Sequence, residues 1–87
     1  MKVKKDYMLC EIAGETVVVP YGSAAADFRG MLRLNSTGAA LWKMLETGAE
    51  ETELAQMLVR EFGADETAAK ADTAEFLEKL RSIGCLE

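Results

Sequence analysis

The sequence has no histidine, a single proline and only two cysteines among its 87 residues. Histidine is the commonest general base and metal ligand. A structural zinc site needs four ligands, which Cys10 and Cys85, near opposite ends of the chain, cannot supply. No glycine-rich phosphate loop, nucleophile elbow or carboxylate pair in an apolar context is present. These absences predict no catalytic residue, no metal site and no cofactor, and they favour a binding module over an enzyme.

Long apolar runs are also missing from the sequence. The chain has no stretch of the roughly 18 apolar residues that a membrane-spanning helix requires. Its basic start, residues 1–6, is not followed by the apolar segment of a signal peptide. We therefore expect a cytoplasmic protein with no membrane partner, whose cysteines are small buried residues rather than a disulfide.

Negative charge exceeds positive charge and gives a formal net charge of −5. The excess lies in residues 46–87, which hold four Lys or Arg and eleven Asp or Glu. Phosphate backbones repel such a surface, so nucleic acid is not an expected partner.

Three short segments with strand character come first, and three helical segments follow. Strands are expected at Tyr7–Ile12, Glu15–Pro20 and residues 30–34, with a hairpin turn at Ala13-Gly14. Helices are expected at residues 36–46, from about residue 50 to residue 62, and at residues 65–83, each followed by glycine. This order predicts one α+β domain over residues 1–87, a winged-helix-like fold with a three-stranded antiparallel sheet followed by three helices.

The period of the hydrophobic pattern changes at Asn35, which is a good helix cap. Before it, Leu32 and Leu34 share one face of a strand. After it, apolar or small residues recur at helical spacing, namely Gly38, Leu41, Trp42 and Leu45. We therefore interpret Leu34 and Trp42 as core residues and Gly38 as a position of close helix packing.

The sequence closely resembles the PqqD-like family, the pyrroloquinoline quinone biosynthesis protein D family. The residues that carry the resemblance are Val19-Pro20, Phe28-Arg29-Gly30, Leu34-Asn35-Ser36-Thr37-Gly38-Ala39, Leu41-Trp42, Gly48 and Phe62. Arg29 stands where the family often has Asn. The resemblance implies a RiPP recognition element, a noncatalytic precursor-peptide chaperone. Such a protein binds the leader segment of a ribosomally made peptide and presents it to a modifying enzyme, often a radical SAM protein. The resemblance does not distinguish the quinone pathway from other peptide pathways.

The resemblance also implies that the leader adds as a strand beside residues 30–34 and packs against the last helix. An edge strand with unpaired main-chain groups suits such an addition, and it is compatible with a monomer or an edge-paired dimer. On the last helix we expect the groove on the flank with an apolar residue and two cations rather than on the more acidic flank. The expected peptide-binding residues are Met31, Leu32, Arg33, Lys70, Ala74, Leu77 and Arg81.

Two other functions remain open at this point. The last two helices, joined by Gly63-Ala64, can form a helix-turn-helix, so a winged-helix transcription regulator is one alternative. Its recognition helix would be residues 65–83, whose acidic residues disfavour DNA: Glu66, Asp72, Glu75 and Glu78. The other alternative is a structural subunit that docks on a larger enzyme.

Overall fold

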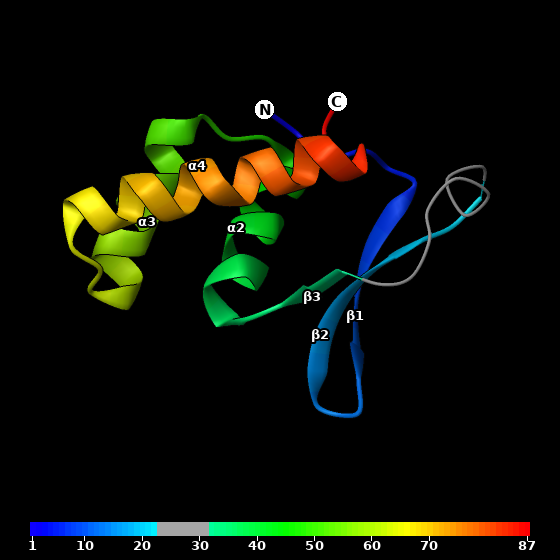
Figure 1. The fold of residues 1–87 in the computed structure, drawn as a ribbon. Helices are drawn as coiled ribbons and strands as arrows, with labels where there is room; N and C mark the ends of the chain where they lie inside the picture. The colour runs from blue at the N-terminus through cyan, green and yellow to red at the C-terminus, as the bar shows by residue number, and fades with distance from the viewer. Residues whose placement is uncertain (23–31) are drawn as a thin grey trace.

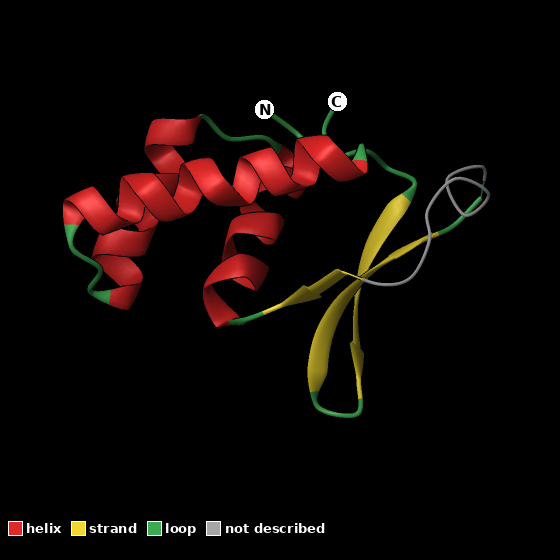
Figure 2. Ribbon diagram, in the orientation of Figure 1, coloured by secondary structure: helices red, strands yellow, loops and turns green. Residues whose placement is uncertain are grey.

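The computed structural model describes residues 1–22 and 32–87, which form a three-stranded sheet followed by three helices (Figures 1 and 2). The strands are β1 (Tyr7–Ile12), β2 (Glu15–Pro20) and β3 (Leu32–Leu34). The helices are α2 (Ser36–Thr47), α3 (Glu51–Phe62) and α4 (Glu66–Ile83). This arrangement confirms the predicted α+β fold. The predicted start of the third strand at Gly30 and the predicted role of Met31 lie outside the described residues.

β1 and β2 form the hairpin predicted from the Ala13-Gly14 turn. Ile12 lies opposite Glu15, so only two residues connect the strands. Ala13 and Gly14 both have positive φ, 53° and 81°. A two-residue turn that matches the right-handed twist of its strands requires such angles, and alanine adopts them less readily than asparagine. The tip of the hairpin extends beyond the helices (Figure 2).

β3 pairs with β2 on the side away from β1, so the strand order is β1-β2-β3 and β3 is an edge strand. The directly opposed residues Leu9, Val18 and Leu32 share one face of the sheet and pack with the helices in the core. Because side chains alternate along a strand, Cys10 and Val17 lie on the other face.

Side-chain caps start two of the helices where the sequence predicts. The Gly38 N–H donates to Asn35 Oδ1 at 2.8 Å at the start of α2. At the start of α4, Asp65 accepts from the N–H groups of Thr67 and Ala68. Both α3 and α4 end at a glycine in the left-handed conformation. The capping roles of Asn35 and Asp65 are therefore confirmed.

The core lies between the sheet and the three helices. Its fully buried large side chains include Trp42 and Leu45 of α2, Leu54 of α3, and Leu77 and Leu80 of α4. Burial of one such aliphatic side chain contributes roughly 1.5 to 3 kcal/mol relative to exposure. The interpretation of Trp42 as a core residue is confirmed.

The N-terminal segment, which the sequence pattern leaves unassigned, closes the fold beside the end of α4. The Val3 N–H donates to the Leu45 carbonyl at 3.0 Å, and the Lys4 N–H donates to the Cys85 carbonyl at 2.8 Å. Val3 also forms an isolated antiparallel bridge with Leu86. The two termini therefore lie side by side (Figure 1).

Candidate functional site

One hydrogen bond at the open end of the hairpin shows which residues of β2 point their main-chain groups to β1 and which point them to β3. The Tyr21 N–H donates to the Asp6 carbonyl at 2.8 Å, which makes these residues a hydrogen-bonded pair of the β1–β2 ladder. Main-chain groups alternate in direction along a strand. Val17, four residues before Tyr21, therefore also points its main-chain groups to β1, and Thr16 and Val18 point theirs to β3.

The alternation along β2 determines which residues of β3 pair with β2 and which face the open edge of the sheet. Thr16 lies opposite Leu34 and Val18 lies opposite Leu32, so both leucines use their main-chain groups to pair with β2. Arg33 lies between them, and its N–H and carbonyl point to the open edge of the sheet. Arg33 is thus the β3 residue whose main chain is available to another strand.

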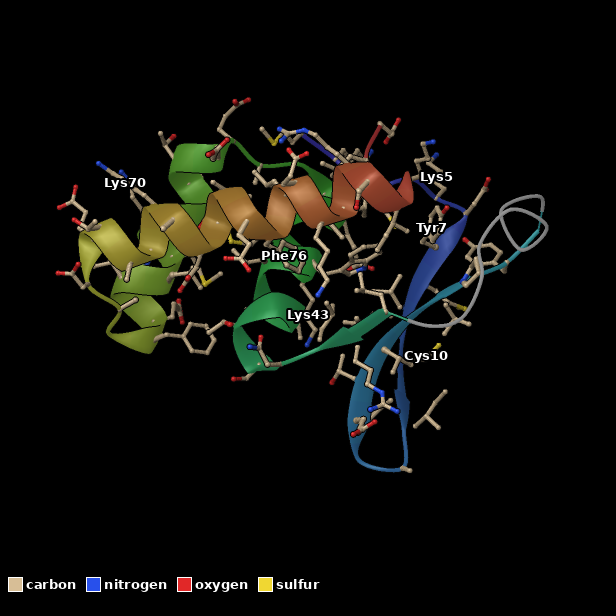
Figure 3. The ribbon with its side chains drawn as sticks, viewed as in Figure 1. Lys5, Tyr7, Cys10, Lys43, Lys70 and Phe76 are labelled. Carbon is tan, nitrogen blue, oxygen red and sulfur yellow. The ribbon has the colours of Figure 1, made fainter. Side chains whose placement is uncertain are left out.

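A groove of about 290 Å³ runs beside this edge, between β3, the first turns of α2, and α4. It is lined from the sheet and α2 by Arg33, Leu34, Asn35, Thr37, Gly38 and Leu41, and from the other helices by Leu58, Asp72, Glu75, Phe76 and Lys79. Figure 3 shows Phe76 on the side of α4 that faces α2.

The floor of the groove is apolar. Leu41 and Leu58 are buried there, and Leu34 and Phe76 are partly buried. A Cβ placed on Gly38 would lie 3.4 Å from both Leu34 Cβ and Phe76 Cε1, so the glycine lets these side chains approach α2 closely. The interpretation of Gly38 as a close-packing position is confirmed.

The wall that α4 contributes is charged. Asp72, Glu75 and Lys79 are all exposed. Within residues 1–22 and 32–87 none of the three belongs to an ion pair. Arg33 on the opposite wall pairs with Glu15, with Nε and Oε2 3.4 Å apart. The groove thus combines an open strand edge, an apolar floor and a wall with two unpaired carboxylates and one unpaired ammonium group.

Residues 15–86 match the model of the coenzyme PQQ synthesis protein D (PqqD) family. The chain belongs to the PqqD family. The match confirms the resemblance seen in the sequence.

Two solved structures resemble this PqqD-family chain over nearly its whole length. One is TbiB1 in complex with the TbiA(beta) leader peptide, with a TM-score of 0.78, 23% identity, and coverage of 100% of this chain and 95% of that chain. The other is lasso peptide synthetase B1 complexed with the leader peptide, with a TM-score of 0.75, 21% identity, and coverage of 97% and 93%. At these identities the likeness shows a shared fold. A comparison with curated proteins gave no match.

The β3 residues expected to bind peptide differ in their placement. Arg33 lines the groove and faces the open edge. Leu32 is buried in the core and pairs its main chain with β2, so it offers no free donor at the edge. Met31 lies outside the described residues.

The α4 residues expected to bind peptide do not line the groove beside β3. Leu77 has no exposed surface, so its interpretation as a surface anchor is wrong. Lys70 forms an ion pair with Glu66, with Nζ and Oε1 3.4 Å apart, and it lines a separate pocket between α3 and α4. Arg81 forms an ion pair with Glu78, with Nη1 and Oε2 3.5 Å apart. Ala74 is exposed but does not line the groove.

The reason for this difference is the rotation of α4 about its axis. The spacing of apolar residues in the sequence predicts a buried stripe of Ala69, Phe76, Leu80 and Ile83 on this helix, whereas the structure buries Ala69, Thr73, Leu77 and Leu80. Leu77 therefore takes the buried position expected for Phe76, and Phe76 lines the groove. The flank of α4 with Asp72 and Glu75 faces β3. The sequence signal that bears on this is Gly38, because a glycine on a buried helix face leaves room for a neighbouring side chain, and Phe76 is one of its neighbours.

Other candidate chemistry is absent from the part of the chain that the structure describes. No group of three or more His, Cys, Asp or Glu is placed to hold a metal ion in residues 1–22 and 32–87. No helix among these residues is long and apolar enough to span a membrane. Cys85 is fully buried, and this burial raises the pKa of its thiol to about 11 although nearby Lys4 acts in the opposite direction. The thiol is therefore protonated at neutral pH and unsuited to act as a nucleophile.

Proposed function

We propose that this protein is a noncatalytic binder of the leader segment of a ribosomally synthesised precursor peptide. The observation that carries the proposal is the groove beside the free main-chain groups of Arg33. Membership of the PqqD family supports it, as do the leader peptides bound by the two structures of the same fold.

The leader binds as an extended strand along the open edge of β3. Its main chain exchanges hydrogen bonds with the N–H and carbonyl of Arg33, which pair with no other strand in residues 1–22 and 32–87. Asn35 continues the extended conformation past β3, with φ −80° and ψ −177°. Alternate side chains of the leader point inward, since they follow the face of Leu34, and enter the apolar floor. Main-chain pairing supplies affinity, and the floor selects side chains.

The bound leader is presented to a modifying enzyme, which is a radical SAM protein or another peptide-modifying enzyme of the cytoplasm. Binding to an edge strand leaves the peptide beyond the groove unrestrained, so the residues to be modified can enter a separate active site. We thus place the chemistry on the partner enzyme and the recognition of the precursor on this protein.

The test is a titration of ¹⁵N-labelled protein with the leader of the precursor peptide encoded beside its gene. We expect amide shifts of Arg33, Leu34 and Asn35 together with those of Gly38 and Phe76. Amides at the hairpin tip, residues 12–15, serve as the internal control and should not move. Absence of binding, or shifts that spare the groove, would contradict the proposal.

A further inference from the structure

The wall of α4 presents its groove residues in one row. Asp72, Glu75, Phe76 and Lys79 are spaced at i, i+3, i+4 and i+7, which places them along one face of the helix. Seven residues of helix rise by about 10 Å, and an extended strand covers that distance in about three residues. A short stretch of peptide therefore passes the whole row.

Neither of the two carboxylates in this row forms an ion pair with another described residue. Asp72 and Glu75 stand one helical turn apart, a spacing at which like charges repel each other. Lys79 is suitably spaced to pair with Glu75, but no nitrogen–oxygen distance within 4.0 Å joins them in the described residues. The charge of Arg33 is offset by Glu15. A peptide that displaces water from the groove would find a negative wall beside the apolar floor, and charge interactions strengthen as water is excluded.

We propose that Asp72 and Glu75 make the groove selective for leaders that carry a lysine or arginine two positions from a large apolar residue. The apolar side chain fills the floor formed by Leu34, Leu41 and Phe76. Inward-facing side chains of a strand recur every second residue, so the next one along the row lies beside the carboxylates. This inference rests on the proposed function and specifies the chemistry of its substrate.

The first experiment selects binders from a displayed library of random peptides of about 12 residues. Wild type should enrich a cation two positions from a large apolar residue. The double variant D72K/E75K should enrich aspartate or glutamate at that position instead. The matched control E61K/E78K makes the same change in net charge outside the groove, at residues paired with Arg60 and Arg81, and should keep the wild-type preference.

The second experiment measures the affinity of one enriched peptide and of its Lys→Glu counterpart for wild-type protein. We expect the lysine peptide to bind about fivefold to thirtyfold more tightly at low salt, because attraction is replaced by repulsion. The ratio should shrink at high salt. This measurement needs no variant to fold.

The outcomes separate the two proposals. Groove-dependent binders without a preference for a cation, or an unchanged preference in D72K/E75K, would overturn the selectivity inference and leave leader binding intact. Binders whose affinity is unaffected by the groove-filling variant Gly38→Leu, provided that it folds, would overturn the proposed function itself. If the preferred peptide charge reverses in D72K/E75K but not in E61K/E78K, and if the affinity ratio shrinks at high salt, both the selectivity inference and the proposed function are supported.

Discussion

Gly38 of α2 lies against Phe76 of α4, and a Cβ on Gly38 would come within 3.4 Å of Phe76 Cε1 and 3.2 Å of Asn35 Oδ1. The contact joins the first turn of one helix to the middle of another. It also sets the depth of the groove, because both residues line it.

Replacement of Gly38 by alanine should weaken leader binding more than it changes stability. The added methyl group takes up space in the floor against Phe76, and it lies 3.2 Å from Asn35 Oδ1, so the capping side chain must shift slightly. Alanine gains about 1 kcal/mol of helix propensity over glycine, which offsets the tight contact. We expect a thermal midpoint close to that of wild type and a lower affinity in the leader titration. An affinity equal to that of wild type would show that this part of the groove is not occupied.

Replacement of Trp42 by alanine should lower the free energy of unfolding by roughly 3 to 5 kcal/mol, because it empties a fully buried site. The Trp42 indole N–H has no hydrogen-bond partner among the described residues. Trp42→Phe should therefore cost less, since it removes volume but no hydrogen bond. Denaturant unfolding followed by circular dichroism measures both variants. An unchanged midpoint with lost peptide binding would place Trp42 in the binding site instead.

Replacement of Arg33 by proline should abolish the main-chain donor at the open edge and weaken leader binding. The β2–β3 ladder should survive, because this N–H points away from β2, and proline is tolerated on edge strands in that position. Arg33→Ala keeps the donor and removes an exposed ion pair of small energetic value, so it should bind nearly as wild type does.

Leu32→Pro is a contrasting control for the Arg33→Pro and Arg33→Ala variants. The Leu32 N–H pairs with β2, so its loss should lower stability. Equal affinities of Arg33→Pro and Arg33→Ala, measured by calorimetry on folded samples, would exclude strand addition at this edge.

Stability should fall as the pH rises from about 9 to about 11. Burial raises the pKa of the Cys85 thiol from 9.0 to about 11. Below pH 9 the thiol is protonated in both states, so its contribution is complete. Between the two values the unfolded chain releases the proton and the folded chain retains it, which favours unfolding by about 2 to 3 kcal/mol in total.

The difference between wild type and Cys85→Ala isolates this effect from other groups that titrate at high pH. The variant should lose less stability between pH 8 and 11 in denaturant unfolding. Cys10→Ala is the matched control, because Cys10 is only partly buried, and it should follow wild type. Parallel curves for wild type and Cys85→Ala would contradict the prediction.

The sequence predicted the elements of this fold well because their ends are determined locally. Asn35 and Asp65 cap helices through bonds that span two or three residues. The Ala13-Gly14 turn likewise sets the register of the hairpin within a few residues. Such signals need no knowledge of the tertiary structure.

The site was less predictable because it depends on how distant elements pack. Phe76 and Leu77 are adjacent apolar residues, and the pattern of α4 alone does not decide which of them is buried. The crossing of α4 over α2 decides it, since Phe76 is held at Gly38. The direction of the Arg33 main chain similarly follows from the hairpin register and not from β3 itself.

The bridge between Val3 and Leu86 has a consequence for synthesis of the chain on the ribosome. Val3 is made before its partner, which follows it by more than 80 residues. Until residue 86 has left the ribosome, Val3 cannot form this bridge. The hairpin and α2 can form from local contacts much earlier. Val3 therefore reaches its final pairing only after the hairpin and α2, which follow it in the chain, can already have formed.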